Sequence, residues 1–353
     1  MTSSQPPRLS LFVEPAEWVE QALAAAAVID GLGVDVPVTL AWAAEVGRML
    51  PRDASLTDRW QLLVGTAFLD VGAARTLEPH LDALAILGEA GIGPDGSDPD
   101  GPDPDGAATW GVFAAEGAGT RLTAEPDATG WTIHGTKPWC SLAGSLSHAL
   151  VTAWVDDEHR RLFAVPLRHE TVTARSGPWH ARGLSQVVSA PVDFAGTPAE
   201  PVGDAGWYLR RLGFAHGGVG VAAAWWGGAM GLLPALRAAA SAERADQIAH
   251  QHLGDADAAL WAARAVLAET ADVFSAGPRA DAGLLANRAR TVTVRAATLA
   301  LETADLALGP LPLVADEAHA RRVADLHLYL RQHHGARDAA RIGRDLAASE
   351  QPW

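Results

Sequence analysis

Cysteine is nearly absent from this 353-residue chain, in which Cys140 is the only one. A single thiol excludes an internal disulfide framework and any zinc site that needs several thiolates. We therefore expect a reducing, cytoplasmic setting. Histidine suggests no metal site either, because His250 and His252 are two residues apart and would lie on different faces of a helix. His333 and His334 are adjacent, without a His-x-x-x-His partner nearby, so no metal is predicted.

Long apolar runs and positive charge are also scarce. No stretch reaches the roughly 18 apolar residues of a membrane span, and no charged segment followed by an apolar run stands at the N-terminus. Lys and Arg total 27 against 42 Asp and Glu, which gives a formal net charge of -15. Such a surface repels polyanions. These absences predict a soluble intracellular protein that binds neither nucleic acid nor a membrane.

The first part of the chain is rich in alanine and leucine at helical spacing, as in Trp60, Leu63, Val64 and Ala67. This pattern predicts an N-terminal helical domain over residues 1–107. With 48% hydrophobic residues, the whole chain is long enough to bury a large core.

An acidic run rich in proline and glycine, at about residues 93–106, ends this first domain. Helix breakers and like charges keep such a segment from packing, which predicts a linker. Its acidic oxygens also suggest a calcium loop. The linker is favoured because no Glu closes the run at the spacing of an EF-hand loop and because its prolines do not fit that pattern.

Residues 108–203 change to the period of two that is typical of strands, and they predict an all-β domain. Asp156 and Asp157 stand between two apolar runs as the turn of a hairpin. Gly, Pro and Asp separate the other candidates. The predicted strands cover residues 110–115, 130–135, 148–155, 161–167, 171–174 and 186–194.

Helical spacing returns after Trp207 and continues through the predicted C-terminal domain, residues 204–353. Two series of apolar residues recur every seven positions, which predicts two long helices with apolar seams. The short connection 275–278 would make them antiparallel neighbours in a bundle. The seams are Leu253, Leu260, Leu267 and Phe274 in the first helix, and Leu285, Val292, Leu299 and Leu306 in the second.

A glycine-rich segment from His216 to Gly220 superficially suggests a dinucleotide-binding turn. Such a turn needs a strand before it and a βαβ unit around it, and neither is predicted here. We therefore expect these glycines to allow close helix packing.

Three segments of the β-region carry a family pattern. Residues 130–141 read GWTIHGTKPWCS, a hairpin followed by Gly-x-Lys and Trp-x-Ser. Residues 113–120 read FAAEGAGT, similar to a Thr-Glu-Pro-x-Ala-Gly-Ser loop but with Ala115 in place of Thr and without the proline. Residues 182–203 are similar to a last strand and its exit. In this order the segments resemble the acyl-CoA dehydrogenase family.

The resemblance covers roughly residues 108–340, and domain order alone extends it to the first hundred. It implies an α+β fold with an N-terminal helical domain, a central β-barrel or sandwich and a C-terminal antiparallel four-helix bundle. It also implies an FAD cofactor. Because FAD often contacts two subunits in this family, a homo-oligomer, or a hetero-oligomer with a related subunit, is implied as well.

Trp139 and Ser141 are the candidates for contact with the flavin ring. A flavin is flat and apolar on its faces and polar at one edge, so its site needs an aromatic wall and hydrogen-bond donors. Being two apart on an extended segment, the two side chains should lie on the same side. The alternative is that Trp139 is an ordinary core residue.

A glycine-rich loop is the candidate for the cofactor's diphosphate. Glycine permits positive φ and close approach of backbone N–H groups to an anion. The alternative is an ordinary turn. Gln247, on a helix that aligns with a core helix of the family, is a further candidate for cofactor contact. The loop candidates are Ala115, Glu116, Gly117, Gly119 and Thr120.

The family's catalytic carboxylate is missing. Counted from Asp325 and Tyr329, the loop position of the family's Glu falls on His333, and a second position used by some subfamilies falls near Arg210. A neutral imidazole can accept a proton whereas arginine cannot. His333, with its neighbour His334, is therefore the catalytic candidate. The alternative is that both merely cap a helix end.

The resemblance implies an FAD-dependent oxidoreductase acting on the CH–CH group of an acyl thioester, carried by CoA or by a carrier protein. Two alternatives stay open. One is a flavin-dependent monooxygenase of the same fold, some of which carry a histidine near this loop. The other is a degenerate subunit that only binds an acyl group or flavin and pairs with a catalytic partner. The electron acceptor is not indicated by the sequence.

Overall fold

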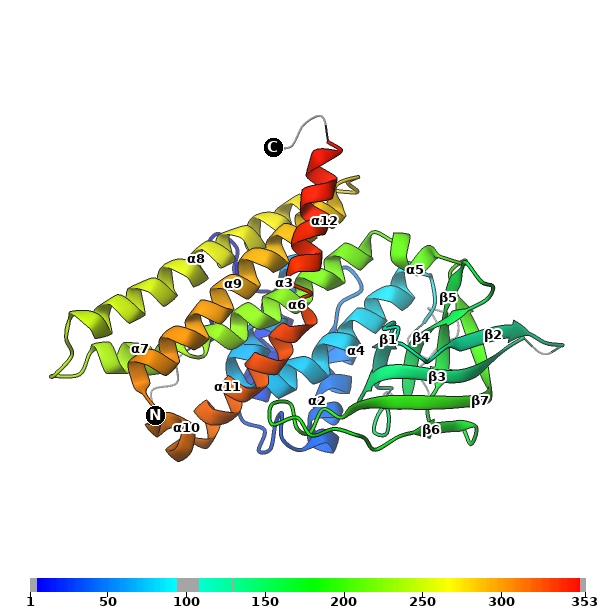
Figure 1. The fold of residues 1–353 in the computed structure, drawn as a ribbon, viewed down its shortest axis with the longest axis horizontal. Helices are drawn as coiled ribbons and strands as arrows, with labels where there is room; N and C mark the ends of the chain where they lie inside the picture. The colour runs from blue at the N-terminus through cyan, green and yellow to red at the C-terminus, as the bar shows by residue number, and fades with distance from the viewer. Residues whose placement is uncertain (1–4, 94–107, 129, 350–353) are drawn as a thin grey trace.

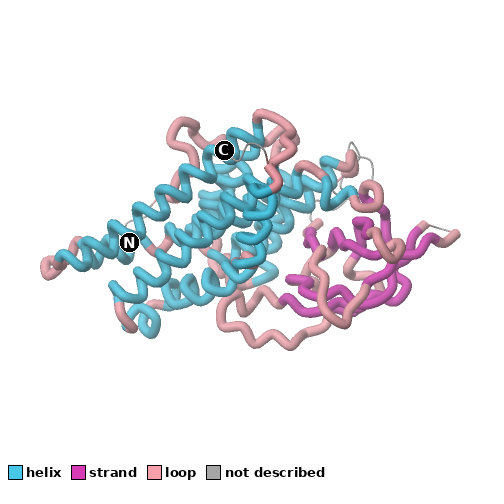
Figure 2. Tube along the Cα trace, turned by 45° about the horizontal axis from the view of Figure 1, so that its top comes forward, coloured by secondary structure: helices cyan, strands magenta, loops and turns pink. Residues whose placement is uncertain are grey.

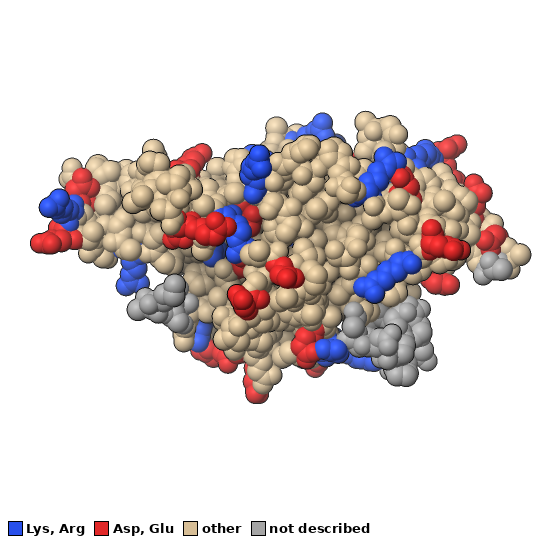
Figure 3. All heavy atoms as spheres, turned by 90° about the horizontal axis from the view of Figure 1, so that it is seen from below, with Lys and Arg blue, Asp and Glu red and all other residues tan. Residues whose placement is uncertain are grey.

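A computed structural model describes residues 5–93, 108–128 and 130–349. Helices fill one end of the molecule and the strands gather at the other (Figures 1 and 2). The acidic run predicted as a linker lies almost entirely outside the described residues. On the face drawn in Figure 3, acidic and basic side chains are mixed and neither sign forms a continuous patch.

Three of the first four helices begin at a side chain that caps them. Asp35, Ser55 and Asp70 each accept a backbone N–H from the first turn of the helix that follows, which satisfies a donor that the helix itself leaves free. The helices are α1 (Glu17–Ala26), α2 (Val36–Met49), α3 (Leu56–Leu69) and α4 (Val71–Glu89).

Seven strands follow in one sheet with the order β1-β4-β2-β3-β7-β5. Strand β6 pairs with β7, and β4 also pairs with β5, so the pairings return to β4. The strands are β1 (Trp110–Phe113), β2 (Leu122–Pro126), β3 (Trp131–Ser141), β4 (His148–Trp154), β5 (Arg160–Pro166), β6 (Val172–Ala174) and β7 (Ser189–Val202).

Three of these strands differ from the prediction. Strand β3 continues to Ser141, well beyond the predicted end at residue 135. Strand β2 was not predicted, because it has only two buried side chains, Leu122 and Ala124, and ends in a proline. Strand β7 begins at Ser189 and continues to Val202, well beyond the predicted end at residue 194. Its antiparallel pairing with β3 and β5 supplies hydrogen bonds that no local pattern in the sequence shows.

The last part of the described chain is helical. One turn of 3-10 helix, Leu330–Gln332, separates the final two helices. The helices are α5 (Trp207–Arg210), α6 (Gly213–Met230), α7 (Leu233–Ala240), α8 (Gln247–Ser275), α9 (Ala282–Leu308), α10 (Leu311–Ala315), α11 (Glu317–Tyr329) and α12 (Ala336–Ala347).

The predicted seam is confirmed in α8, where Leu260, Leu267 and Phe274 are buried. In α9 it is wrong, because Leu299 is 39% exposed and Leu306 is 74% exposed. A straight helix drifts by about 20° per heptad, so a seven-residue series leaves the contact face. Helix α9 instead buries small residues, including Ala286, Ala289, Ala296, Ala297, Ala300 and Ala304.

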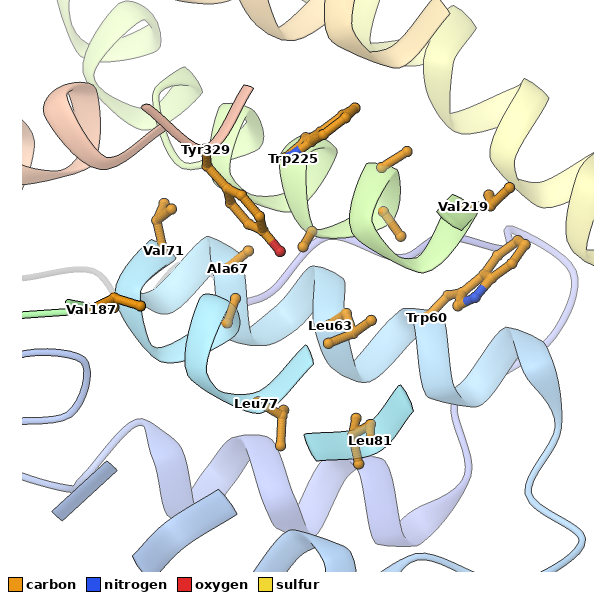
Figure 4. Close-up of a cluster of buried hydrophobic side chains, with 14 of the residues drawn as sticks. Trp60, Leu63, Ala67, Val71, Leu77, Leu81, Val187, Val219, Trp225 and Tyr329 are labelled. Carbon is orange, nitrogen blue, oxygen red and sulfur yellow. The ribbon is translucent and has the colours of Figure 1, made fainter. Parts of the chain in front are cut away.

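Helix α6 lies close to α3 at two glycines. At Gly220, one of the glycines predicted to allow close packing, a Cβ would lie 3.4 Å from side-chain atoms of Leu63 and Trp60. A Cβ at Gly227 would lie 2.2 Å from the carbonyl oxygen of Val64. Figure 4 shows Trp60 and Leu63 of α3 facing α6, which carries Val219. In the described chain the stretch Gly213–Ala240 is apolar and long enough to cross a membrane, but 72% of its apolar window is buried in the protein. Its composition is that of a core helix.

Helix α11 holds the end of α3 through Arg322. The guanidinium group donates to three backbone carbonyls that have no helical donor there. These carbonyls belong to Ala67 at 3.0 Å, Phe68 at 2.7 Å and Leu69 at 3.0 Å.

The same helix holds the sheet through Asp325, whose carboxylate accepts the backbone N–H of Leu184. The preceding residue, Gly183, lies so close to α11 that a Cβ there would be 1.9 Å from the carbonyl oxygen of Ala324. Burial raises the pKa of Asp325 to about 6. The loop before β7 and the start of the C-terminal loop are therefore tied to one helix.

Lys137 is the only lysine of the chain and its side chain is 1% exposed. Its ammonium group donates to Oε1 of Glu116 at 2.7 Å and to the carbonyl and hydroxyl oxygens of Thr152 at 2.8 and 2.9 Å. All three of its N–H donors are used. This lysine therefore ties β3 and the loop after β1 to β4.

Replacing Lys137 with Met should lower the free energy of unfolding by about 2–4 kcal/mol, because Thr152 loses a buried donor. Urea denaturation measures the change. The matched variant Glu116→Gln keeps an acceptor for the ammonium group but removes its counter-charge, so it should also be destabilising, by less than Lys137→Met. Equal losses in the two variants would contradict this account of the lysine.

Candidate functional site

Trp139 is an exposed indole on the sheet, with 63% of the residue accessible. Its φ of 60° lies in the left-handed region, and the pairing of β3 with β7 shifts between Lys137 and Cys140. Ser141 is buried. The register shift is a bulge at Trp139, which interrupts the regular pairing of β3 with β7. An accessible, flat indole remains available to a planar ligand.

Ser141 connects the sheet with α4. Its hydroxyl accepts a hydrogen bond from Nη2 of Arg75 at 2.9 Å and lies 2.7 Å from the hydroxyl of Ser189. Arg75 was not predicted as a site residue, since the pattern in the sequence is confined to the β-region. The polar chain that begins at Ser141 therefore continues into the N-terminal helices.

In the predicted diphosphate loop, Glu116 makes ion pairs within the β-region, and the residues from Gly117 to Thr120 form a turn. Glu116 is held by ion pairs with Lys137 and with Arg160, at 2.7 and 3.0 Å, and serves the sheet. Gly119 has a φ of 76°, and the Thr120 hydroxyl donates to the Gly117 carbonyl, which closes the turn.

Within the described chain, no backbone hydrogen bond is made by the N–H groups of Gly117 and Gly119. A Cβ at Gly117 would lie 3.0 Å from the Pro138 ring. The turn thus presents free N–H donors next to β3, which carries Trp139. This arrangement suits an anionic group of a ligand that stacks on the indole.

Three further predicted residues lie in the helical part of the chain and not on the sheet. Gln247 begins α8 at the end of the helices opposite the sheet, as Figure 1 shows. His334 is exposed, and its backbone N–H donates to Asp338. His333 is nearly buried, with Nδ1 3.2 Å from the Asp338 carboxylate. Burial lowers the pKa of His333, and the charge of Asp338 partly offsets this effect.

Glu78 is the carboxylate nearest to this polar chain. Its Oε2 lies 3.3 Å from Nη1 of Arg75 and accepts a hydrogen bond of 3.4 Å from the Tyr329 hydroxyl. Burial raises the pKa of Glu78 to about 7, and the charge of Arg75 opposes the shift. The next residue, Pro79, lies inside α4 and has no N–H for the Arg75 carbonyl. Glu78 is thus a base that titrates near neutrality.

A cavity of about 770 Å³ lies between α2, α3, α4 and α6. Glu78 is on its wall, whereas His333 is not. The wall is aliphatic in large part, with charged and imidazole groups between the leucines. The polar lining residues are Arg48, Arg52, Arg59, Glu78, His80, Asp82, Glu89, Arg211 and His216.

On the α6 side of the cavity two carboxylates share one buried guanidinium group. Arg211 is 2% exposed and pairs with Asp82 at 3.2 Å and with Glu89 at 3.1 Å. A Cβ at Gly217 would lie 2.7 Å from the Asp82 carboxylate, so the glycine makes room for it. This triad fixes the start of α6 against α4, whereas Glu78 has its own ion pair with Arg75.

No protein-family model and no characterised protein match the chain by sequence. Solved structures do match it. Glutaryl-CoA dehydrogenase from Mycobacterium smegmatis has a TM-score of 0.80 at 19% identity, over 96% of both chains. Methanesulfinate monooxygenase MsuC from Pseudomonas fluorescens has a TM-score of 0.78 at 17% identity, over 96% of this chain and 98% of that one.

A third match is KijD3, solved in complex with FMN and dTDP-3-amino-2,3,6-trideoxy-4-keto-3-methyl-D-glucose. Its TM-score is 0.73 at 20% identity, over 94% of this chain and 91% of that one. Dehydrogenase and monooxygenase thus share one architecture with this chain. At these identities the likeness shows the fold, and the chain has the fold of the acyl-CoA dehydrogenase-like proteins, as its β-region predicted.

Proposed function

We infer that this chain is a flavin-dependent oxidoreductase whose flavin ring lies against Trp139 and Ser141 and whose substrate enters the cavity beside Glu78. One observation carries the proposal: Arg75 contacts both Ser141 and Glu78. The C-terminal loop has no carboxylate at the position of the family's catalytic Glu. In this proposal Glu78 of α4 takes that role, and Arg75 connects it to Ser141 at the expected edge of the flavin.

The residues present fit a flavin. Trp139 offers an accessible aromatic face, and the Gly117–Gly119 turn offers free N–H groups for a phosphate. FAD is the cofactor implied by the sequence resemblance, whereas KijD3 was solved with FMN. Gln247 lies far from this turn, so it would contact an adenine half only across subunits of an oligomer.

The likeness in fold also supports the finer architecture expected from the sequence. The circuit of strand pairings through β4, β2, β3, β7 and β5 would be the family's central barrel. Helices α6, α8, α9 and α11 would be its bundle. Ser141 of β3 and Glu78 of α4 are connected through Arg75 where the β-region meets the N-terminal helices.

In the proposed reaction, the protein's side chains would handle the proton and the flavin would accept the electrons. A bound flavin supplies the acceptor for two electrons. Glu78 would take the proton from the carbon next to an acyl thioester carbonyl, with Arg75 and the Tyr329 hydroxyl stabilising its anion. CoA and a carrier protein are both proposed as carriers of that thioester.

A flavin-dependent monooxygenase is the second candidate. The charged and imidazole groups in the cavity wall favour it, because a plain acyl chain needs only an apolar wall. His333, held at Asp338, would then serve as the proton donor. A degenerate subunit without catalysis is the third candidate, and turnover with any substrate would exclude it.

Trp139→Ala should weaken flavin binding about tenfold, because stacking on an indole contributes about 1–1.5 kcal/mol. Quenching of flavin fluorescence measures the dissociation constants of FAD and FMN. Trp261→Ala is the matched control, since Trp261 is 60% exposed on α8. Equal affinity of wild type and Trp139→Ala, or no flavin binding at all, would contradict the proposal.

Glu78→Gln should lower turnover by a factor of about 10² to 10⁴, as expected when a general base is lost. In the wild type, turnover should rise with pH through about 7 and then level off, because only ionised Glu78 accepts a proton. The exposed Glu302→Gln in α9 is the control. If His333→Ala abolishes turnover while Glu78→Gln preserves it, the base is not Glu78.

The two enzymatic candidates differ in their use of oxygen. A dehydrogenase should bleach its flavin when an acyl-CoA is added without oxygen, which absorbance spectroscopy records. A monooxygenase should instead consume oxygen only when both reduced flavin and substrate are present, as an oxygen electrode shows. Bleaching by acyl-CoA without oxygen would exclude the second candidate as the main activity.

A further inference from the structure

Arg59 brings a positive charge into the cavity wall, and no described residue forms an ion pair with it. It lies on α3, whose residues Leu56, Trp60 and Leu63 also line the cavity. The spacing of these four positions places them on one face of the helix. The guanidinium group makes one hydrogen bond to the described chain, from Nε to the carbonyl oxygen of Ala54 at 3.3 Å. Its two Nη nitrogens therefore have no partner there.

The free end of this guanidinium group is accessible from the cavity. Some buried side-chain nitrogens lack a partner in the described chain, and Nη1 and Nη2 of Arg59 are not among them. Because these two nitrogens make no hydrogen bond with a described residue, they must retain accessible surface. Burial of the rest of the side chain lowers the pKa of Arg59, and the charge of Glu89 opposes the shift. A charge that is partly withdrawn from water without a counterion is stabilised when an anion binds.

The carboxylate that attracts Arg59 is engaged elsewhere. Oε1 of Glu89 accepts a hydrogen bond from Nη1 of Arg211 at 3.1 Å, and a Cβ at Gly213 would collide with the same oxygen. Asp82 accepts a hydrogen bond from Nη2 of Arg211 at 3.2 Å. Arg211 thus holds two carboxylates of the wall, and Arg59 is left for an anion that comes from outside the chain.

The loop between α2 and α3 holds Arg59 in place. The carbonyl of Ala54 accepts from Nε, and the N–H of Ala54 donates to the Pro51 carbonyl at 3.0 Å, which closes a turn. Leu50, Pro51 and Ala54 of this loop line the cavity. Because Nε is already used, the edge formed by Nη1 and Nη2 is the one left for a ligand. This planar edge matches a carboxylate, which can accept two parallel N–H bonds.

The rest of the cavity suits an apolar body joined to such a carboxylate. Its wall is aliphatic in large part, and its volume of about 770 Å³ lies within the range of small-molecule sites. A carboxylate placed at Glu78 would raise the cost of ionising that base. The charged end of the ligand therefore belongs at Arg59, and its apolar part belongs toward Glu78.

We propose that the cavity takes an acyl group with a carboxylate at its far end, which accepts hydrogen bonds from Nη1 and Nη2 of Arg59 while the other end lies beside Glu78. The substrate class is then that of dicarboxylic acids joined to a carrier through one of their two carboxyl groups. The thioester end rests on the proposed function, but binding of the carboxylate does not. An acyl group without the second carboxylate would leave Arg59 unpaired.

The test compares hexanoate with hexanamide, which have the same length and differ in the charge of one end. Isothermal titration of the full chain at neutral pH gives both dissociation constants, and the measured quantity is the ratio of the hexanamide constant to the hexanoate constant. A charge-assisted hydrogen bond predicts a ratio of roughly ten to a hundred in the wild type. The ratio should fall to about one in Arg59→Met, which removes the guanidinium group and keeps an unbranched side chain.

Two controls separate a contact with Arg59 from a general effect of charge. Arg237→Met has the same net charge as Arg59→Met, and Arg237 is exposed on α7, so its ratio should equal that of the wild type. Arg48→Met removes an exposed arginine that also lines the cavity and should lower the ratio by about twofold at most. If Arg59→Met fails to fold, Arg59→Gln decides in its place, because it keeps a donor for the Ala54 carbonyl.

The proposal is overturned if the wild type binds neither compound, if the ratio is unchanged in a folded Arg59 variant, or if Arg48→Met lowers the ratio as much as Arg59→Met does. A protein that binds no flavin but shows a ratio dependent on Arg59 would refute the proposed function and leave this subsite standing. If flavin binds and turnover needs Glu78, an unchanged ratio in Arg59→Met would overturn the subsite alone.

Discussion

The contact of Arg322 with the end of α3 is the constraint on which the rest of the site depends. Only Asp70 separates α3 from α4, and it begins α4 by accepting the N–H of Ala73. Arg321 pairs with the carboxylate of Asp70 at 2.5 Å, next to the carbonyls that Arg322 holds. Two adjacent arginines of α11 thus set the point at which α4 starts, and with it the directions of the side chains that follow.

Helix α4 therefore contacts several parts of the molecule, and different side chains make each contact. Arg75 reaches the sheet at Ser141, Glu78 meets Tyr329, and His80 is turned toward α2 and β1. These polar groups lie within about two turns of the helix, and Pro79 stands among them. The hydrophobic core on either side isolates them from water, which is why both titratable groups have shifted pKa values.

The sequence predicted the fold well where the signal was local. The segment with the Trp-x-Ser pattern is part of a strand, β3, in the structure. The spacing of apolar residues in α8 predicted which face of that helix is buried. It failed where distant pairing decides: the bulge at Trp139 depends on β7, and the buried face of α9 depends on packing of alanines. Glu78, which we propose as the base, was not a candidate because the carboxylate was sought on the C-terminal loop. A proline inside an otherwise helical pattern was the signal available for it.

The burial of Lys137 has a consequence for handling the molecule. The only lysine amine of the chain is inside the sheet and already makes three hydrogen bonds. Amine-directed crosslinkers, acylating dyes and lysine acetylation therefore find no lysine on the folded surface. Labelling at this position would report opening of the strands around it, so the side chain is a built-in probe of the integrity of the β-region.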